Sequence, residues 1–162
     1  MRSLSPSDFE ESARNFVEWA KEYNESATVP IACCLKATPQ ESFITTASVY
    51  LTFASGIQVF YSPAYQLPVL YLPVNHVLDN DAMSTRIFGD GQMLSYTENP
   101  INGLPCLYMH PCNTAQILEE LAPTNATDAL FKWLGFYNHK ITPAFSLPLE
   151  FFAFISTKYK RL

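Results

Sequence analysis

The chain has 162 residues, of which 48% are hydrophobic and 15% are charged, and its formal net charge is −5. This composition excludes an intrinsically disordered chain, and it gives no support to nucleic-acid binding, which requires a clustered basic surface. No apolar stretch reaches the roughly 20 residues of a transmembrane helix. The length predicts one compact domain over residues 1–162.

The first predicted element is an amphipathic helix over residues 6–23. Ser5 can cap this helix, and Pro6 suits its first position. Apolar side chains then recur at helical spacing from Phe9 to Tyr23, with acidic side chains mostly on the other faces. Such a stripe predicts packing against a sheet.

Strand patterns follow this helix. Strands are predicted over residues 29–37, 43–54, 57–61 and 67–72. In the second of these, alternation places Tyr50 on the polar face, where its hydroxyl either faces solvent or reaches a functional site. Because prolines flank the apolar residues of 57–73, we expect this stretch to offer an exposed sheet edge to an acceptor protein.

The second half of the chain combines a loop, short strands and helices. We predict a connection over 74–91, strands over 92–96 and 104–109 around a turn at 99–103, and helices over 113–121 and 127–138. Asn113 can cap the first of these helices. Residues 147–155 fit a helix or a strand equally well. This order predicts an α+β fold in which an antiparallel sheet packs against helices.

The four cysteines predict the compartment in which the chain works. Their spacings do not indicate a disulfide framework, and residues 1–7 lack the apolar segment of a signal peptide. We therefore predict a cytoplasmic protein with reduced thiols. Cys33, Cys34 and Cys106 fall within apolar strand patterns, which predicts core packing for these side chains.

Cys112 is the candidate nucleophile of this sequence. It lies between Pro111, which ends a strand, and Asn113, which opens a helix. The unpaired N–H groups and positive dipole of a helix N-terminus favour a thiolate over a thiol. His110 could assist, although residues two apart in an extended segment point in opposite directions. An inert, buried cysteine is the alternative interpretation.

The residues around Cys112 resemble a known signature. The run 107–114, Leu-Tyr-Met-His-Pro-Cys-Asn-Thr, is similar to the active site of the autophagy ubiquitin-like-protein conjugating enzymes, in which His-Pro-Cys closes a strand and opens a helix. Residues 49–53 and 68–72 resemble the paired central strands of that family, and residues 131–136 resemble its tryptophan-containing helix. The resemblance implies a ubiquitin-conjugating-enzyme-like core with Cys112 as the thioester residue.

The family resemblance also implies a reaction and its partners. One branch transfers its modifier to a lipid head group and carries a large acidic insertion, which this sequence lacks. The other branch receives autophagy-related protein 12 from the activating enzyme, autophagy-related protein 7, and transfers it to a lysine of autophagy-related protein 5. The resemblance favours this second branch, a transferase without a cofactor that is recruited to the site where autophagosomes form.

The residue that stabilises the oxyanion stays open at this point. Ubiquitin-conjugating enzymes generally have an asparagine in a His-Pro-Asn motif upstream of the cysteine, and this sequence lacks that motif. Asn99, Asn102 and Asn113 provide the same side-chain type, although turn and cap roles are more common for such residues. The Tyr50 hydroxyl is a further candidate, and His110 is a candidate supporting residue.

Two other functions remain open from the residues alone. A cysteine protease would use Cys112 with His76 or His139 as its base, which requires a hydrogen bond between the two side chains. A non-catalytic binding module would leave Cys112 inert. No metal site is predicted, because Cys106 and Cys112 do not have the paired spacing of zinc ligands.

Overall fold

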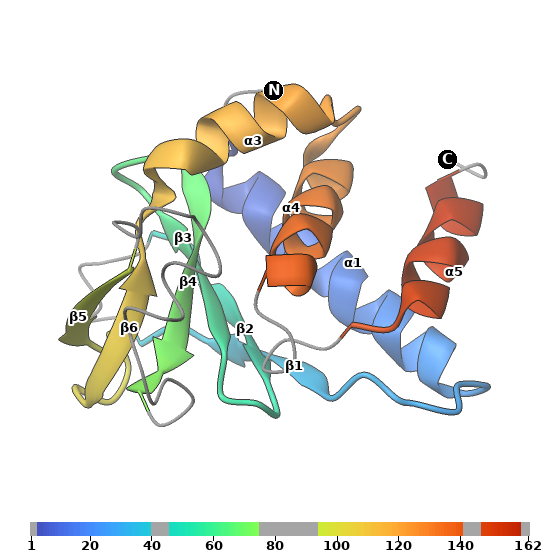
Figure 1. The fold of residues 1–162 in the computed structure, drawn as a ribbon, viewed down its shortest axis with the longest axis horizontal. Helices are drawn as coiled ribbons and strands as arrows, with labels where there is room; N and C mark the ends of the chain where they lie inside the picture. Colours follow the sequence, from blue (N-terminus) through green and yellow to red (C-terminus); the bar gives the residue numbers. More distant parts are fainter. Residues whose placement is uncertain (1–2, 40–45, 75–93, 141–146, 160–162) are drawn as a thin grey trace.

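A computed structural model describes residues 3–39, 46–74, 94–140 and 147–159 of the chain. Within these residues, the strands form one antiparallel sheet in the order β1-β2-β3-β4-β6-β5. The long helices gather beside one face of this sheet (Figure 1). The predicted α+β fold, with a ubiquitin-conjugating-enzyme-like core, is therefore confirmed.

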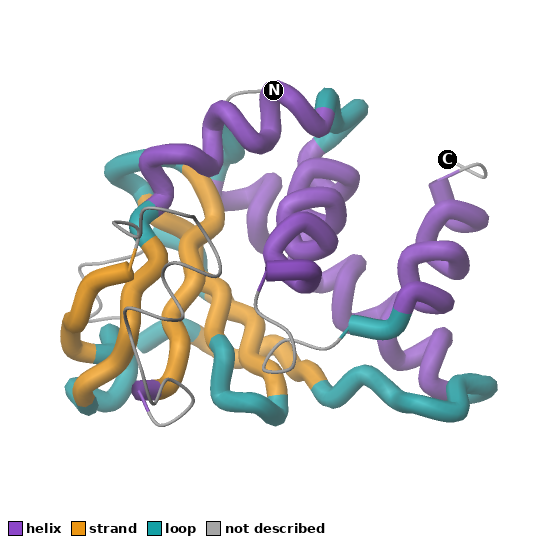
Figure 2. Tube along the Cα trace, viewed as in Figure 1, coloured by secondary structure: helices purple, strands orange, loops and turns teal. Residues whose placement is uncertain are grey.

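The elements follow the chain with few departures from the predicted ranges (Figure 2). The strands are β1 Cys33–Ala37, β2 Val49–Phe53, β3 Gln58–Ser62, β4 Leu67–Pro73, β5 Leu94–Glu98 and β6 Pro105–Met109. The helices are α1 Pro6–Asn24, α3 Thr114–Leu121, α4 Ala126–Lys140 and α5 Leu149–Tyr159, with a 3-10 turn, η2, at Pro111–Asn113. The stretch that fitted either a helix or a strand is thus helical. No described helix is long and apolar enough to cross a bilayer.

Helix α1 begins with the cap that its sequence predicts. Ser5 Oγ accepts a hydrogen bond from the Asp8 backbone N–H (3.1 Å), and the Asp8 carboxylate accepts one from the Ser5 backbone N–H (3.0 Å). The Ser5 hydroxyl also donates to this carboxylate (2.6 Å), and the hydroxyl and the backbone N–H of Ser5 together lower the pKa of Asp8, because both favour its charged form. The reciprocal pair satisfies N–H groups that the helix itself cannot pair.

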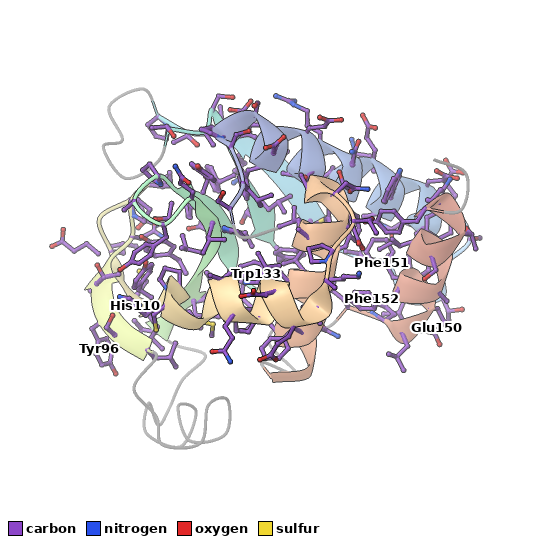
Figure 3. All side chains as sticks on the ribbon, turned by 90° about the horizontal axis from the view of Figure 1, so that it is seen from above. Tyr96, His110, Trp133, Glu150, Phe151 and Phe152 are labelled. Atoms are coloured by element: carbon purple, nitrogen blue, oxygen red, sulfur yellow. The ribbon has the colours of Figure 1, made fainter. Side chains whose placement is uncertain are left out.

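The main core lies between the sheet and the helices. Phe16 of α1 is fully buried, and its ring lies 5.9 Å from Phe53 of β2, 5.0 Å from Phe131 of α4 and 5.5 Å from Phe151 of α5. The Phe16 side chain therefore packs α1 against the sheet and against two further helices, α4 and α5. Figure 3 places Phe151 at the helical end of the molecule and His110 at the opposite, sheet end.

The other face of the sheet is also apolar, which the alternating pattern of β2 did not predict. Tyr50 is only 4% exposed and stacks on Phe60 of β3, with ring centroids 4.6 Å apart. The Phe60 ring packs in turn against Tyr71 of β4 (5.3 Å). The expectation that Tyr50 faces solvent is wrong, because aromatic rings from neighbouring strands cover this face.

The order of the strands also corrects the expected sheet edge. Strands β3 and β4 lie inside the sheet, between β2 and β6, so residues 57–73 do not form an exposed edge. Pro68 is accommodated because β6 pairs only with Leu70 to Pro73 of β4, so Pro68 has a strand partner on one side only. The outermost strands of the described sheet are β1 and β5.

Candidate active site

The junction between β6 and α3 presents the candidate nucleophile. His110 is extended (φ −66°, ψ 129°), and Pro111 begins the 3-10 turn, which closes with a hydrogen bond from the Thr114 N–H to the Pro111 carbonyl. Cys112 lies in this turn with its side chain exposed. The thiol is therefore accessible at the passage from a strand to a helix, where the sequence predicted it.

His110 caps the cysteine turn. Its Nδ1 atom accepts a hydrogen bond from the backbone N–H of Cys112 (3.2 Å), so the imidazole turns back toward the cysteine rather than away from it. A nitrogen that accepts carries no proton, which leaves the proton of the neutral ring on Nε2. Nε2 lies 3.3 Å from the Tyr65 hydroxyl, to which it donates. His110 thus acts on the backbone of Cys112.

Tyr65 is the residue at this site that the sequence did not predict. It lies in the turn between β3 and β4, is 43% exposed, and its ring meets that of His110 edge to face at 5.5 Å. The two residues are 45 positions apart. Only the pairing of β4 with β6 brings this turn beside the end of β6, so no local pattern could have revealed it.

The structure brings only part of the predicted site together. His110, Cys112 and Asn113 are consecutive in the turn. His110 caps the 3-10 turn, whereas the cap predicted at Asn113 for the following helix stays a prediction, because the Asn113 side chain is outside the described part of the chain. Tyr50 is not near the thiol, because β3 and β4 separate β2 from β6, a distance of about 14 Å at the usual strand spacing. His76 and the His139 side chain also fall outside the described part.

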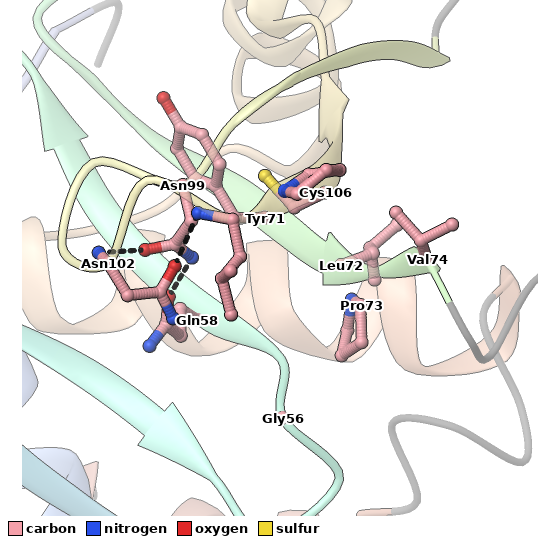
Figure 4. Close-up of a pocket in the computed structure, with 11 residues that line it drawn as sticks. Gly56, Gln58, Tyr71, Leu72, Pro73, Val74, Asn99, Asn102 and Cys106 are labelled. Carbon is pink, nitrogen blue, oxygen red and sulfur yellow. Dashed lines mark hydrogen bonds between the residues drawn. The ribbon is translucent and has the colours of Figure 1, made fainter.

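The two other candidate asparagines, Asn99 and Asn102, lie in the turn before β6, at the end of this strand away from Cys112. Asn99 donates to Gln58 Oε1 (2.6 Å) and accepts from the Ile101 N–H (2.9 Å), and Asn102 accepts from the Leu104 N–H (3.0 Å). Both side chains are among those that line a hollow of about 510 Å³, and Figure 4 shows these lining residues. Both asparagines hold the β5–β6 turn, so neither is placed to stabilise an oxyanion at Cys112.

The other cysteines differ from Cys112 in their surroundings. Burial raises the pKa of Cys33 to about 12 and also raises that of Cys106, so both thiols stay protonated at neutral pH. Cys34 is exposed on β1, and the expectation that it packs in the core is wrong, because alternation directs it away from the helices. Among the described residues, no group of three or more potential ligands is placed to hold a metal ion.

The cap at His110 gives a testable prediction. His110→Ala removes the acceptor for the Cys112 N–H and is expected to cost about 1 kcal/mol of unfolding free energy, as for other helix caps. His110→Asn supplies a side-chain oxygen at the same place and should recover most of this loss. Urea denaturation of both variants measures the difference. Equal destabilisation by the two substitutions would contradict the cap.

An exposed cysteine between a strand and a helix, on an antiparallel sheet backed by helices, defines a protein built like the ubiquitin-conjugating enzymes. A family model described as autophagocytosis associated protein, active-site domain, matches residues 8–146. No curated protein matches the chain significantly. The chain belongs to this family of autophagy conjugating enzymes, and the matched residues include the whole β6–α3 junction.

Proposed function

We propose that the chain accepts a ubiquitin-like modifier as a thioester on Cys112 and transfers it to a lysine of an acceptor protein. The observation that carries this proposal is the exposed Cys112 thiol at the β6–α3 junction, within the residues matched to the family. In the finer form of the proposal, the protein is autophagy-related protein 10. Its modifier is autophagy-related protein 12, its activating enzyme is autophagy-related protein 7, and its acceptor is autophagy-related protein 5.

The length of the β4–β5 connection supports a protein acceptor over a lipid acceptor. The lipid-directed branch of the family has a large acidic insertion. In this chain only residues 74–93 separate the end of β4 from the start of β5, and the remaining connections are also short. We propose that the protein works in the cytoplasm, where it is recruited to the site of autophagosome formation.

The proposed reaction proceeds in two acyl transfers. The Cys112 thiolate first attacks the activated C-terminal carbonyl of the modifier, forms a C–S bond and releases the activating enzyme's thiolate. The lysine amine then attacks the thioester carbonyl, forms a C–N bond and expels the Cys112 thiolate, while the amine loses a proton to solvent. Covalent catalysis divides one difficult transfer into two easier steps. His110 contributes by holding the turn, because its unprotonated nitrogen is occupied by the Cys112 N–H.

A charging experiment tests the proposal. The protein is incubated with the activating enzyme, ATP and the modifier, and the products are separated with and without reductant. We expect a reducible adduct on the wild type and a reductant-resistant oxyester on Cys112→Ser, because a serine ester resists thiols. Cys34→Ser is the matched control, since Cys34 is also exposed but lies on β1, and it should charge normally.

The same experiment separates conjugation from the alternatives. Peptide hydrolysis without a covalent adduct would favour a cysteine protease. An absence of both adduct and hydrolysis, together with unchanged function of a Cys112→Ala variant, would favour a binding module. Either result would overturn the proposal. Replacing autophagy-related protein 12 with another modifier tests the finer assignment, because only the cognate modifier should charge efficiently.

A further inference from the structure

Three polar side-chain ends meet in the core directly behind the cysteine turn. Thr114 is the first residue of α3, two positions after Cys112, while Trp133 and Tyr137 lie one helical turn apart on α4. Each of the three is only 1% exposed. In Figure 3, Trp133 lies between His110 and Phe151, where α3 packs on α4. Such buried polar groups need hydrogen-bond partners.

Hydrogen bonds through the Thr114 hydroxyl join the three groups. The Trp133 Nε1–H lies 3.5 Å from Thr114 Oγ1, and an indole N–H can only donate. Thr114 therefore accepts from Trp133, and its hydroxyl also makes a hydrogen bond with Tyr137. The rings of Trp133 and Tyr137 pack edge to face at 5.1 Å. The Thr114 hydroxyl thus links both α4 side chains to the first residue of α3.

Tyr137 lies within electrostatic range of Cys112. Burial raises the pKa of Tyr137 to about 12, against the opposing hydrogen bond from Thr114, and the charge of an ionised Cys112 raises it further. The phenol therefore keeps its proton at neutral pH, and it interacts electrostatically with the residue that the proposed reaction uses. The buried hydrogen-bond network of Thr114, Trp133 and Tyr137 therefore connects α4 to the surroundings of the Cys112 sulfur.

Both the backbone N–H and the hydroxyl of Thr114 make hydrogen bonds. Its backbone N–H closes the 3-10 turn by donating to the Pro111 carbonyl, and its hydroxyl bonds to α4. On the outer side, the turn is held by His110 through the Cys112 N–H. The turn is therefore fixed from two directions, by His110 at the surface and by Thr114 in the core.

We propose that Thr114 is a positioning residue, whose hydroxyl fixes the Cys112 turn on α4 and so holds the sulfur in its reactive orientation. The inference deepens the proposed function, since it assigns a support to the same nucleophile. Thr114 does not touch the reacting atoms, and its effect passes through the turn. A reacting group held in place by buried hydrogen bonds loses rate when those bonds are removed.

Two substitutions separate the hydroxyl from the shape of the side chain. Thr114→Val keeps the shape and removes the hydroxyl, whereas Thr114→Ser keeps the hydroxyl. Alkylation by iodoacetamide is followed at each cysteine by peptide mass spectrometry. We expect the rate at Cys112, relative to that at Cys34, to fall about tenfold in Thr114→Val and to stay near the wild-type value in Thr114→Ser. The Trp133 indole N–H resonance should move in Thr114→Val only.

The outcomes decide the inference in each case. A shifted indole resonance with an unchanged Cys112 rate in Thr114→Val would overturn it. If Thr114→Val unfolds, which would be seen as alkylation of the buried Cys106, Tyr137→Phe becomes the deciding variant, and an unchanged rate there would overturn the inference. Alkylation needs neither the modifier nor the activating enzyme. A wild-type protein that fails to charge would therefore refute the proposed function without affecting this measurement.

Discussion

Cys112→Ala is expected to reduce conjugate formation to the level seen without enzyme, because no other group in the turn can carry the acyl chain. The same change should alter the free energy of unfolding by less than about 0.5 kcal/mol, since the side chain is exposed. Conjugate formation in a reconstituted reaction measures the first effect, and urea denaturation measures the second. Loss of activity with intact stability would identify a chemical role.

Cys106→Ala provides the opposite control. The Cys106 side chain is 4% exposed in the aromatic cluster of the outer sheet face, so its removal should cost about 1 kcal/mol of stability and leave conjugation nearly unchanged. Residual conjugate formation by Cys112→Ala would contradict the assignment of the nucleophile. Complete inactivity of a folded Cys106→Ala variant would also contradict it.

Phe16→Ala is expected to have the largest effect on stability. The ring packs against aromatic side chains from β2, α4 and α5, so truncation leaves a cavity at the point where these elements meet. Such a change costs about 3–5 kcal/mol, a large share of the 5–15 kcal/mol that stabilises a typical domain. Thermal unfolding followed by circular dichroism should show a strongly lowered melting temperature.

Two matched variants show whether the position of Phe16 or its hydrophobicity causes the loss. Phe16→Leu keeps most of the apolar volume and should cost less than half as much as Phe16→Ala. Tyr96→Ala removes an aromatic ring that is 62% exposed on β5, and it should leave the melting temperature almost unchanged. Similar losses for Phe16→Ala and Tyr96→Ala would refute this description of the core.

The elements that depend on neighbouring residues were predictable from the sequence. Helix α1 was predicted to within a residue at its end because Ser5, Pro6 and the stripe from Phe9 act within a few turns. The strand-to-helix passage at Cys112 was predictable for the same reason. The single domain over residues 1–162 stays a prediction.

The features that depend on distant pairing were not predictable. Strands β3 and β4 lie inside the sheet because β4 pairs with β6, and no local sequence pattern encodes this pairing. The pairing of β4 with β6 also brings Tyr65 beside His110. Alternation placed Tyr50 on the correct face of β2, opposite Leu51, but it does not say what covers each face, so the burial of Tyr50 was not predicted. The cap of the 3-10 turn by His110 was not predicted, because residues two apart in an extended segment usually point in opposite directions.

The C-terminal helix has a consequence for the limits of the folding unit. The family match ends at residue 146, before α5 begins at Leu149. Yet Phe151 is fully buried, its ring lies 5.3 Å from Tyr23, and Lys158 forms an ion pair with Glu22. A chain shortened to the matched residues would lack Phe151 and would therefore expose one side of the Phe16 ring to water. The stretch that the family model matches is therefore shorter than the stretch whose side chains build the core.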